Sequence, residues 1–217
     1  MHRRLQNRYN ERMMRPRAIL FDLDGVLVHS IEAWYRMLVV AAHHFRRPHI
    51  TRASFDAGWG QGIDADMQTF FQGCQAYEVE RYYADHLLDH AEHIEITEDA
   101  PRTLERLRQH GIPCALITNT PTGLARDILE WAALLEAFTV VVGAEEGLAS
   151  KPAPDPILLA CEQLQWSPQQ CLMIGDSRFD QQAALAAECP FLGYRMTRGA
   201  SVQNLSEVVD LVEAATE

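Results

Sequence analysis

Short apolar runs alternate with amphipathic segments along most of the chain from Arg17 onward. The apolar runs have the length of buried strands, and they cover residues 18–24, 112–119, 138–143, 171–176 and 190–194. The segments between them carry helical patterns, and the segment at 99–111 has an early proline and a closing glycine, which are start and stop signals of a helix. This alternation predicts an α/β fold whose core is a doubly wound, Rossmann-like parallel sheet with helices on both faces.

Residues 30–96 interrupt the alternation. They begin with the helical stretch SIEAWYRMLVVAAHHF, pass through the glycine-bearing DAGWGQGID, and contain no convincing strand pattern. The sequence therefore predicts an all-helical domain at 30–96, inserted directly after the first strand. The α/β core is then formed by 17–29 and 97–217, and residues 1–16 are expected to be a flexible basic leader.

Composition and charge narrow the class of protein. The chain has 217 residues, of which 47% are hydrophobic and 23% charged, as in soluble globular proteins. The net charge of −11 divides into +5 for residues 1–17 and −16 for the rest, and such an acidic body is a poor partner for a nucleic-acid backbone. Nucleic acid is therefore not expected as a partner. No apolar run reaches transmembrane length, so a membrane is not expected as a partner either. Nothing in the pattern indicates an oligomeric state.

The cysteines and the leader bear on location. Five cysteines without a CxxC pair are expected to be small core side chains in a reducing compartment. The leader lacks the apolar region of a secretory signal. Three interpretations of it remain: a frayed tail, an organelle-targeting stretch, or a start codon placed upstream of Met13 or Met14. We expect a cytoplasmic protein.

Acidic residues stand where predicted strands end. Asp22 and Asp24 close the first strand, and Asp176 closes the fourth, with Asp180 one helical turn later. Ligands of such sheets bind beyond the carboxyl ends of the strands, and residues two apart on a strand face the same side, so Asp22 and Asp24 are expected to share one site. Because converging carboxylates repel one another, a hard divalent cation such as Mg²⁺ is expected among them.

Lys151 is the only lysine of the chain, in which the other 18 basic residues counted with it are arginines. It lies between a serine and a proline in the segment SKPAPDP. A compact ammonium fits gaps that a planar guanidinium does not. The position therefore predicts a site that requires a small point charge.

Four segments together resemble the signature motifs of the haloacid dehalogenase superfamily. They are, in order, DLDGVL, LITN, SKPAPDP and GDSRFD. The resemblance extends over nearly the whole chain from residue 17, and the insert resembles the α-helical cap of that superfamily. Within the superfamily the likeness is to phosphoglycolate phosphatases, through KPAPDPILLACEQL and GDSRFDQQAALAAECP.

The resemblance implies roles for individual residues. Asp22 matches the nucleophile that becomes an aspartyl phosphate, and Asp24 matches the general acid and base. Thr118 matches the hydroxyl that binds the transferring phosphoryl group, and Asn119 is expected to bind substrate through its backbone. Lys151 is expected to hold the nucleophile and the phosphate together.

The resemblance also implies a Mg²⁺ site. Its ligands are expected to be the carboxylates of Asp22 and Asp176 and the main-chain carbonyl of Asp24. Asp180 matches an acid that positions Lys151.

Two features of the predicted insert and its hinge concern substrate choice. Trp59 and Gln61 lie in a glycine-bearing loop, which is either a substrate-binding loop over the active site or a simple turn between two helices. His29, beside the hinge of the insert, stands where many relatives have aspartate. Because of this difference, the resemblance does not predict how the insert closes or which substrate it selects.

The sequence thus predicts a Mg²⁺-dependent phosphatase that acts on a small phosphorylated metabolite, such as phosphoglycolate or a sugar phosphate. A dehalogenase is disfavoured because Asp24 supplies an acid and base that dehalogenation does not need. A phosphonatase is disfavoured because the insert has no lysine. Two alternatives remain: a phosphotransferase resembling β-phosphoglucomutase, although Trp34 stands where those enzymes carry histidine, and a non-catalytic binding protein on the same fold.

Overall fold

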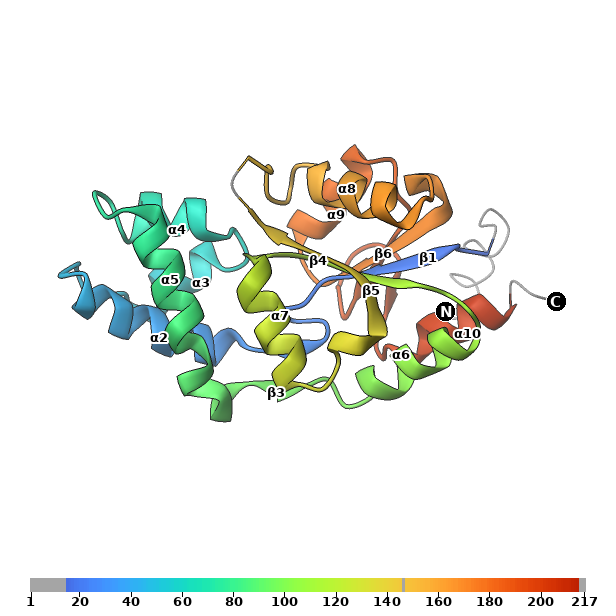
Figure 1. Ribbon diagram of the computed structural model, residues 1–217, viewed down its shortest axis with the longest axis horizontal. Helices are drawn as coiled ribbons and strands as arrows, with labels where there is room; N and C mark the ends of the chain where they lie inside the picture. Colours follow the sequence, from blue (N-terminus) through green and yellow to red (C-terminus); the bar gives the residue numbers. More distant parts are fainter. Residues whose placement is uncertain (1–14, 146, 215–217) are drawn as a thin grey trace.

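A six-stranded sheet forms the centre of the computed structural model, which describes residues 15–145 and 147–214 (Figure 1). All neighbouring strands are parallel, in the order β5-β4-β1-β6-β7-β8. The strands are β1 (Ala18–Phe21), β4 (Cys114–Pro121), β5 (Phe138–Ala144), β6 (Cys171–Gly175), β7 (Phe191–Tyr194) and β8 (Ser201–Val202). The basic leader predicted at 1–16 lies outside the described residues except for its last two.

Helices cover both faces of this sheet. One face carries α6 (Ala100–Gln109), α7 (Thr122–Trp131) and α10 (Ser206–Ala214), and the other carries α8 (Asp155–Leu164) and α9 (Arg178–Ala186) (Figure 1). Alternate residues of β1 point to opposite faces: Ile19 and Phe21 join one apolar cluster, and Ala18 and Leu20 join the other. The predicted doubly wound α/β core is therefore confirmed.

The segment 30–96, which the sequence predicts to be a helical insert, lies at one end of the sheet (Figure 1). It contains α2 (Ile31–His44), α3 (Arg52–Gly58), α4 (Ile63–Thr69), α5 (Ala76–His86) and the 3₁₀ segment η1 (Leu87–His93). The chain leaves and returns through a two-stranded antiparallel sheet of β2 (Val28–His29) and β3 (Glu95–Ile96). The expectation of a purely helical segment misses β3, because two residues are too few to show a strand period.

Two strand boundaries differ from the prediction. β1 ends at Phe21, so Asp22 and Asp24 lie in the loop that follows it and not on the strand. The loop turns at Gly25, whose φ of +91° is a conformation that favours glycine. β4 runs on to Pro121, with its pairing to β5 irregular after Ile117. The short β8 was not predicted, since its two residues carry no pattern.

Short 3₁₀ turns precede two strands of the sheet. They are η2 (Leu135–Ala137), before β5, and η3 (Pro168–Gln170), before β6. No described helix combines the length and the apolar character that crossing a membrane requires.

Candidate active site

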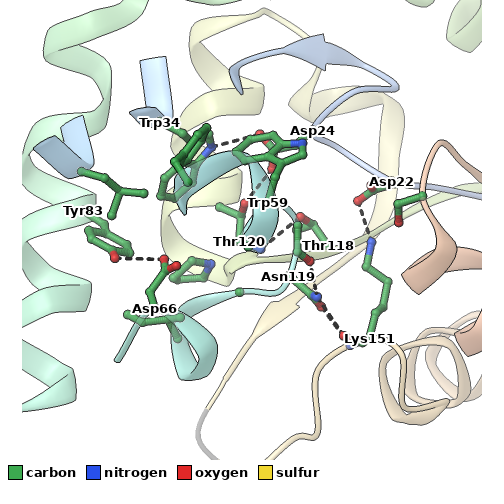
Figure 2. Close-up of a pocket in the computed structure, with 18 of the residues that line it drawn as sticks. Asp22, Asp24, Trp34, Trp59, Asp66, Tyr83, Thr118, Asn119, Thr120 and Lys151 are labelled. Carbon is green, nitrogen blue, oxygen red and sulfur yellow. Dashed lines mark hydrogen bonds and ion pairs between the residues drawn. The ribbon is translucent and has the colours of Figure 1, made fainter. Parts of the chain in front are cut away.

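The carboxyl ends of three neighbouring strands form one side of a cavity of about 220 Å³ (Figure 2). Asp22 follows β1, Thr118 lies in β4, and Asp176 follows β6. Because β4, β1 and β6 are adjacent, these three side chains from distant parts of the sequence line the same cavity. Lys151, from the segment between β5 and α8, joins them.

Lys151 is at the centre of a buried hydrogen-bond network. Its Nζ donates to Asp22 Oδ1 at 2.7 Å, to Asp180 Oδ1 at 2.6 Å and to the carbonyl of Ile117 at 3.0 Å. An ammonium has three donors, so all are used. Burial alone lowers the pKa of Lys151, but the carboxylates of Asp180 and Asp22 outweigh it and raise that pKa above its usual value. The lysine is therefore charged, and its position is fixed.

Asp180 is placed by the start of α9. Its Oδ2 accepts from the backbone N–H of Ser177 at 3.0 Å and from the Ser177 hydroxyl at 2.6 Å, and Ser177 in turn caps the helix. A side chain at Gly175 would place its Cβ 2.3 Å from the Cβ of Asp180, so only glycine fits there. The predicted contact of Asp180 with Lys151 is present at the other carboxylate oxygen, Oδ1.

Three carboxylates, of Asp22, Asp176 and Asp180, offer oxygen atoms that lie within 4.8 Å of one another. Burial and the neighbouring charge of Asp180 raise the pKa of Asp22 well above its usual value, and they raise that of Asp176 to about 7. A single ammonium faces the three acids, so negative charge remains uncompensated. Hard oxygen donors with an excess of negative charge fit a divalent cation such as Mg²⁺.

Asp24 lines the same cavity, but its carboxylate is held apart from that cluster. It accepts hydrogen bonds from the Thr120 hydroxyl at 2.7 Å and the Trp34 indole N–H at 3.1 Å (Figure 2). It accepts a third from the Ser30 hydroxyl. Sequence reasoning missed these three donors, since they come from two distant parts of the sequence: Ser30 is the N-cap of α2 and Trp34 lies in its first turn, whereas Thr120 lies in β4. The signals were the spacing of four residues between Ser30 and Trp34 and the position of Thr120 two residues after Thr118.

Gly25 allows the loop after β1 to approach the cluster. A Cβ at this position would lie 2.0 Å from Asp176 Oδ2 and would displace that carboxylate. The backbone of Asp24 and Gly25 therefore lies directly beside Asp176. The role of the Asp24 main-chain carbonyl as a metal ligand, together with the carboxylates of Asp22 and Asp176, stays a prediction.

Asn119 uses its side chain to join three segments. Its amide accepts from the Lys151 backbone N–H at 2.8 Å and donates to the carbonyls of Lys151 at 2.9 Å and Gly60 at 3.0 Å. The backbone donor to substrate that the resemblance implies stays a prediction. The Asn119 side chain has a separate role, because it fixes the backbone that carries Lys151 and ties it to the insert.

The loop between α3 and α4 reaches the cavity. Trp59, Gly60 and Gly62 line it, and a Cβ at Gly62 would lie 3.3 Å from Asn119. Gln61 is not among the lining residues, because its side-chain amide turns back to the carbonyl of Ala57 at 3.3 Å. Of the two residues predicted in this loop, the structure therefore brings Trp59 to the site and turns Gln61 away.

His29 lies in β2, at the junction with the insert. Its Nε2 is 3.4 Å from the Thr97 hydroxyl, and burial, followed by the charge of Arg195, lowers its pKa. It lines an adjoining pocket of about 300 Å³, which it shares with Trp59, Asp176 and Arg195. His29 is thus beside the cavity of the acidic cluster but does not line it.

Comparisons with known proteins agree with this geometry. The family model of the haloacid dehalogenase-like hydrolases matches residues 19–194. Phosphoglycolate phosphatase of Escherichia coli (strain K12) is 30% identical over 220 residues, which cover 90% of this chain and 85% of that protein. Phosphoglycolate phosphatase of Shigella boydii serotype 4 (strain Sb227) is 43% identical over 223 residues, with coverage of 90% and 85%.

A solved structure shows the same fold. A mutant of CbbY from Rhodobacter sphaeroides, in complex with xylulose-(1,5)bisphosphate, has a TM-score of 0.77 at 17% identity, over 88% of this chain and 96% of that one. The chain therefore belongs to the haloacid dehalogenase-like hydrolases. Within that family it is phosphoglycolate phosphatase-like, and its relatives indicate a phosphoric monoester hydrolase.

Proposed function

We propose that the chain hydrolyses a small phosphorylated metabolite, with Mg²⁺ as cofactor, through a phosphoryl group held transiently on Asp22. The observation that carries this proposal is the ion pair of 2.7 Å between Lys151 Nζ and Asp22 Oδ1 in the wall of the cavity that Thr118 and Asp176 also line. Two anions, a carboxylate and a phosphate, must meet there, and Lys151 supplies positive charge at that place.

In the first step Asp22 is the nucleophile. Lys151 holds its Oδ1, so its other oxygen is oriented to attack phosphorus. As the new O–P bond forms, the bond from phosphorus to the leaving oxygen breaks, and the Asp24 carboxyl gives its proton to that oxygen. The Thr118 hydroxyl donates to the phosphoryl oxygens, and Lys151 stabilises their negative charge.

In the second step the phosphoryl group passes to water. Asp24, now a carboxylate, takes a proton from a water molecule while the water oxygen attacks phosphorus. The bond between Asp22 and phosphorus breaks, inorganic phosphate leaves, and Asp24 is again protonated. The donors Thr120, Trp34 and Ser30 orient the Asp24 carboxyl group.

Mg²⁺ would be held by the carboxylates of Asp22 and Asp176 and the main-chain carbonyl of Asp24. When bound, it supplies positive charge that offsets the carboxylates and polarises the phosphoryl group. Asp180, whose two oxygens bind Lys151 and Ser177, serves to position the lysine.

No observation favours the phosphotransferase alternative. Lys151 is the only lysine of the chain and lies outside the insert, and Trp34 donates its indole N–H to Asp24. Asp22, Asp24 and Asp176 all line the cavity, so the structure likewise offers no loss of acids that would favour a non-catalytic binding protein.

We expect this activity in the cytoplasm. The five cysteines are free, and Cys114, Cys161, Cys171 and Cys189 are buried as small apolar side chains. Thiols of this kind suit a reducing compartment, and they agree with the role expected from their spacing in the sequence.

Removal of divalent cations should stop turnover. We expect excess EDTA to lower kcat on p-nitrophenyl phosphate by about a hundredfold or more, because the uncompensated acids then repel the phosphate. Added Mg²⁺ should restore the rate, whereas NaCl at equal ionic strength should not. A chelated and dialysed enzyme that retains its full rate would contradict the metal requirement.

Trp59 and Gln61 provide a matched test of the loop between α3 and α4. Trp59→Ala should lower kcat/KM by about tenfold on the best substrate, because it removes a large apolar side chain from the cavity wall. Gln61→Ala should stay within about twofold of the unmodified protein, since that side chain faces the carbonyl of Ala57. Steady-state kinetics on both variants measure this, and equal losses would show that the loop acts only through its fold.

A further inference from the structure

The insert forms the part of the cavity wall that lies away from Lys151. Trp34 and Leu38 of α2, Phe55 of α3 and Ile63 of α4 line it, and each is less than 10% exposed. This wall is apolar except for one pair of polar side chains, Asp66 and Tyr83. In Figure 2 that pair and the Asp22–Lys151 ion pair lie on opposite sides of the cavity.

Asp66 of α4 is oriented by Tyr83 of α5. The Tyr83 hydroxyl donates to Asp66 Oδ2 at 3.0 Å, and the tyrosine is 1% exposed. Its ring packs edge-on against Trp34 and Phe71, with centroids 5.5 and 6.2 Å apart. No other described residue donates a hydrogen bond to the Asp66 side chain, so its Oδ1 is available as an acceptor in the cavity wall.

The charge state of Asp66 depends on pH near neutrality. Burial raises its pKa to about 7, and the hydrogen bond from Tyr83 opposes that shift. Above this pKa the group is a carboxylate, which accepts hydrogen bonds and attracts cations but repels other carboxylates. A pH of about 8.5 therefore presents the ionised form.

Cations are scarce in the same wall. Lys151 is the only basic side chain among the described residues that line the cavity, and its three donors bind Asp22, Asp180 and the Ile117 carbonyl. A leaving group that carries a carboxylate would thus face Asp66 without a cationic partner. One alternative cation is Arg195, which lines the adjoining pocket.

We propose that the cavity selects phosphomonoesters whose leaving group has an apolar body and a hydrogen-bond donor, a hydroxyl or an ammonium, that binds Asp66. Esters whose leaving group ends in a carboxylate are disfavoured. Asp66 is the residue that sets this selectivity, and Tyr83 positions it. The inference rests on the proposed phosphatase activity and names its substrate class.

A panel of matched alkyl phosphates tests this selectivity at pH 8.5 in saturating Mg²⁺. The esters have two to four carbons and end in hydroxyl, ammonium, carboxylate or methyl, so phosphoglycolate is the two-carbon carboxylate. At the best chain length we expect kcat/KM of the hydroxyl or the ammonium ester to exceed that of the carboxylate ester by about thirtyfold or more. An ester whose kcat/KM exceeds that of the methyl ester carries a donor that Asp66 binds, so the comparison distinguishes hydroxyl from ammonium.

Variants of Asp66 then connect the preference to this residue. Asp66→Asn should lower the ratio of kcat/KM for the ammonium ester to kcat/KM for the carboxylate ester at least about tenfold. For p-nitrophenyl phosphate, which has neither group, kcat/KM should change by less than about threefold. The matched control is Asp64→Asn, on the same helix but exposed, which should keep the ratio. Tyr83→Phe should lower the ratio in the same direction, and exposed Tyr77→Phe should not.

The outcomes separate the inference from the proposed function. No hydrolysis of any ester would overturn both. Hydrolysis of p-nitrophenyl phosphate together with a preference for phosphoglycolate would overturn the inference alone. If Arg195→Gln then lost that preference, the carboxylate would be placed in the adjoining pocket. An unchanged ratio in folded Asp66→Asn would also overturn it, and if that variant does not fold, Tyr83→Phe decides.

Discussion

Asp22→Asn should abolish phosphatase activity and leave the fold intact. The carboxamide has nearly the shape of the carboxylate and can still accept from Lys151, but it is not a nucleophile. We expect kcat to fall by about a thousandfold or more on every substrate. The measurement is steady-state phosphate release, with circular dichroism as the test of folding.

Asp127→Asn is the matched control for this variant, since Asp127 is exposed on α7 and the same change there should not alter kcat. Asparagine can deamidate to aspartate, so the mass of the variant must be verified before and after the assay. A verified Asp22→Asn protein that retains a tenth of the original kcat would rule out covalent catalysis by this residue.

The Lys151→Arg enzyme should also be severely impaired, although the other 18 residues counted as Lys or Arg in this chain are all arginines. The ammonium has three acceptors within 3.0 Å, and its side chain is 3% exposed. A guanidinium is larger and planar, so it must displace Asp22 or Asp180. A displacement of about 1 Å can cost a hundredfold in rate, so we expect kcat/KM to fall by about two decades, roughly 3 kcal/mol.

Lys151→Ala should lose at least as much activity and should also destabilise the protein. It leaves buried carboxylates without their counterion, which typically costs about 3–5 kcal/mol. Urea unfolding of Lys151→Ala measures this cost, and kinetics compare Lys151→Arg with Arg126→Lys, an exposed exchange between the same residue types. A Lys151→Arg enzyme within threefold of the original rate would show that position 151 needs only charge.

Much of the fold could be predicted because its elements have strong local patterns. The strands β1, β4, β5 and β6 are short apolar runs, and their carboxyl ends bring Asp22 and Asp176 together at the predicted edge of the sheet. The strands β2, β3 and β8 could not be predicted, because two residues carry no period.

Sequence reasoning could not predict contacts that depend on the direction in which a side chain points. Nothing in the local pattern shows that Gln61 turns to the Ala57 carbonyl or that the Asn119 amide holds the Lys151 backbone. The pair of Asp66 and Tyr83 forms only because α4 and α5 pack together, and neither residue stands out in its own helix. Helix packing, and not sequence spacing, builds that part of the cavity.

The hydrogen bond from Asn119 to the Gly60 carbonyl has a consequence for the timing of catalysis. A single hydrogen bond contributes about 1 kcal/mol net, which biases a two-state equilibrium only about fivefold. This hydrogen bond alone therefore couples the insert to the lysine-bearing segment only weakly, and a bound ester that contacts both adds to that coupling. Once the ester bond is broken, the alcohol and the phosphate no longer connect the two parts, so cleavage itself shortens the residence time of the products.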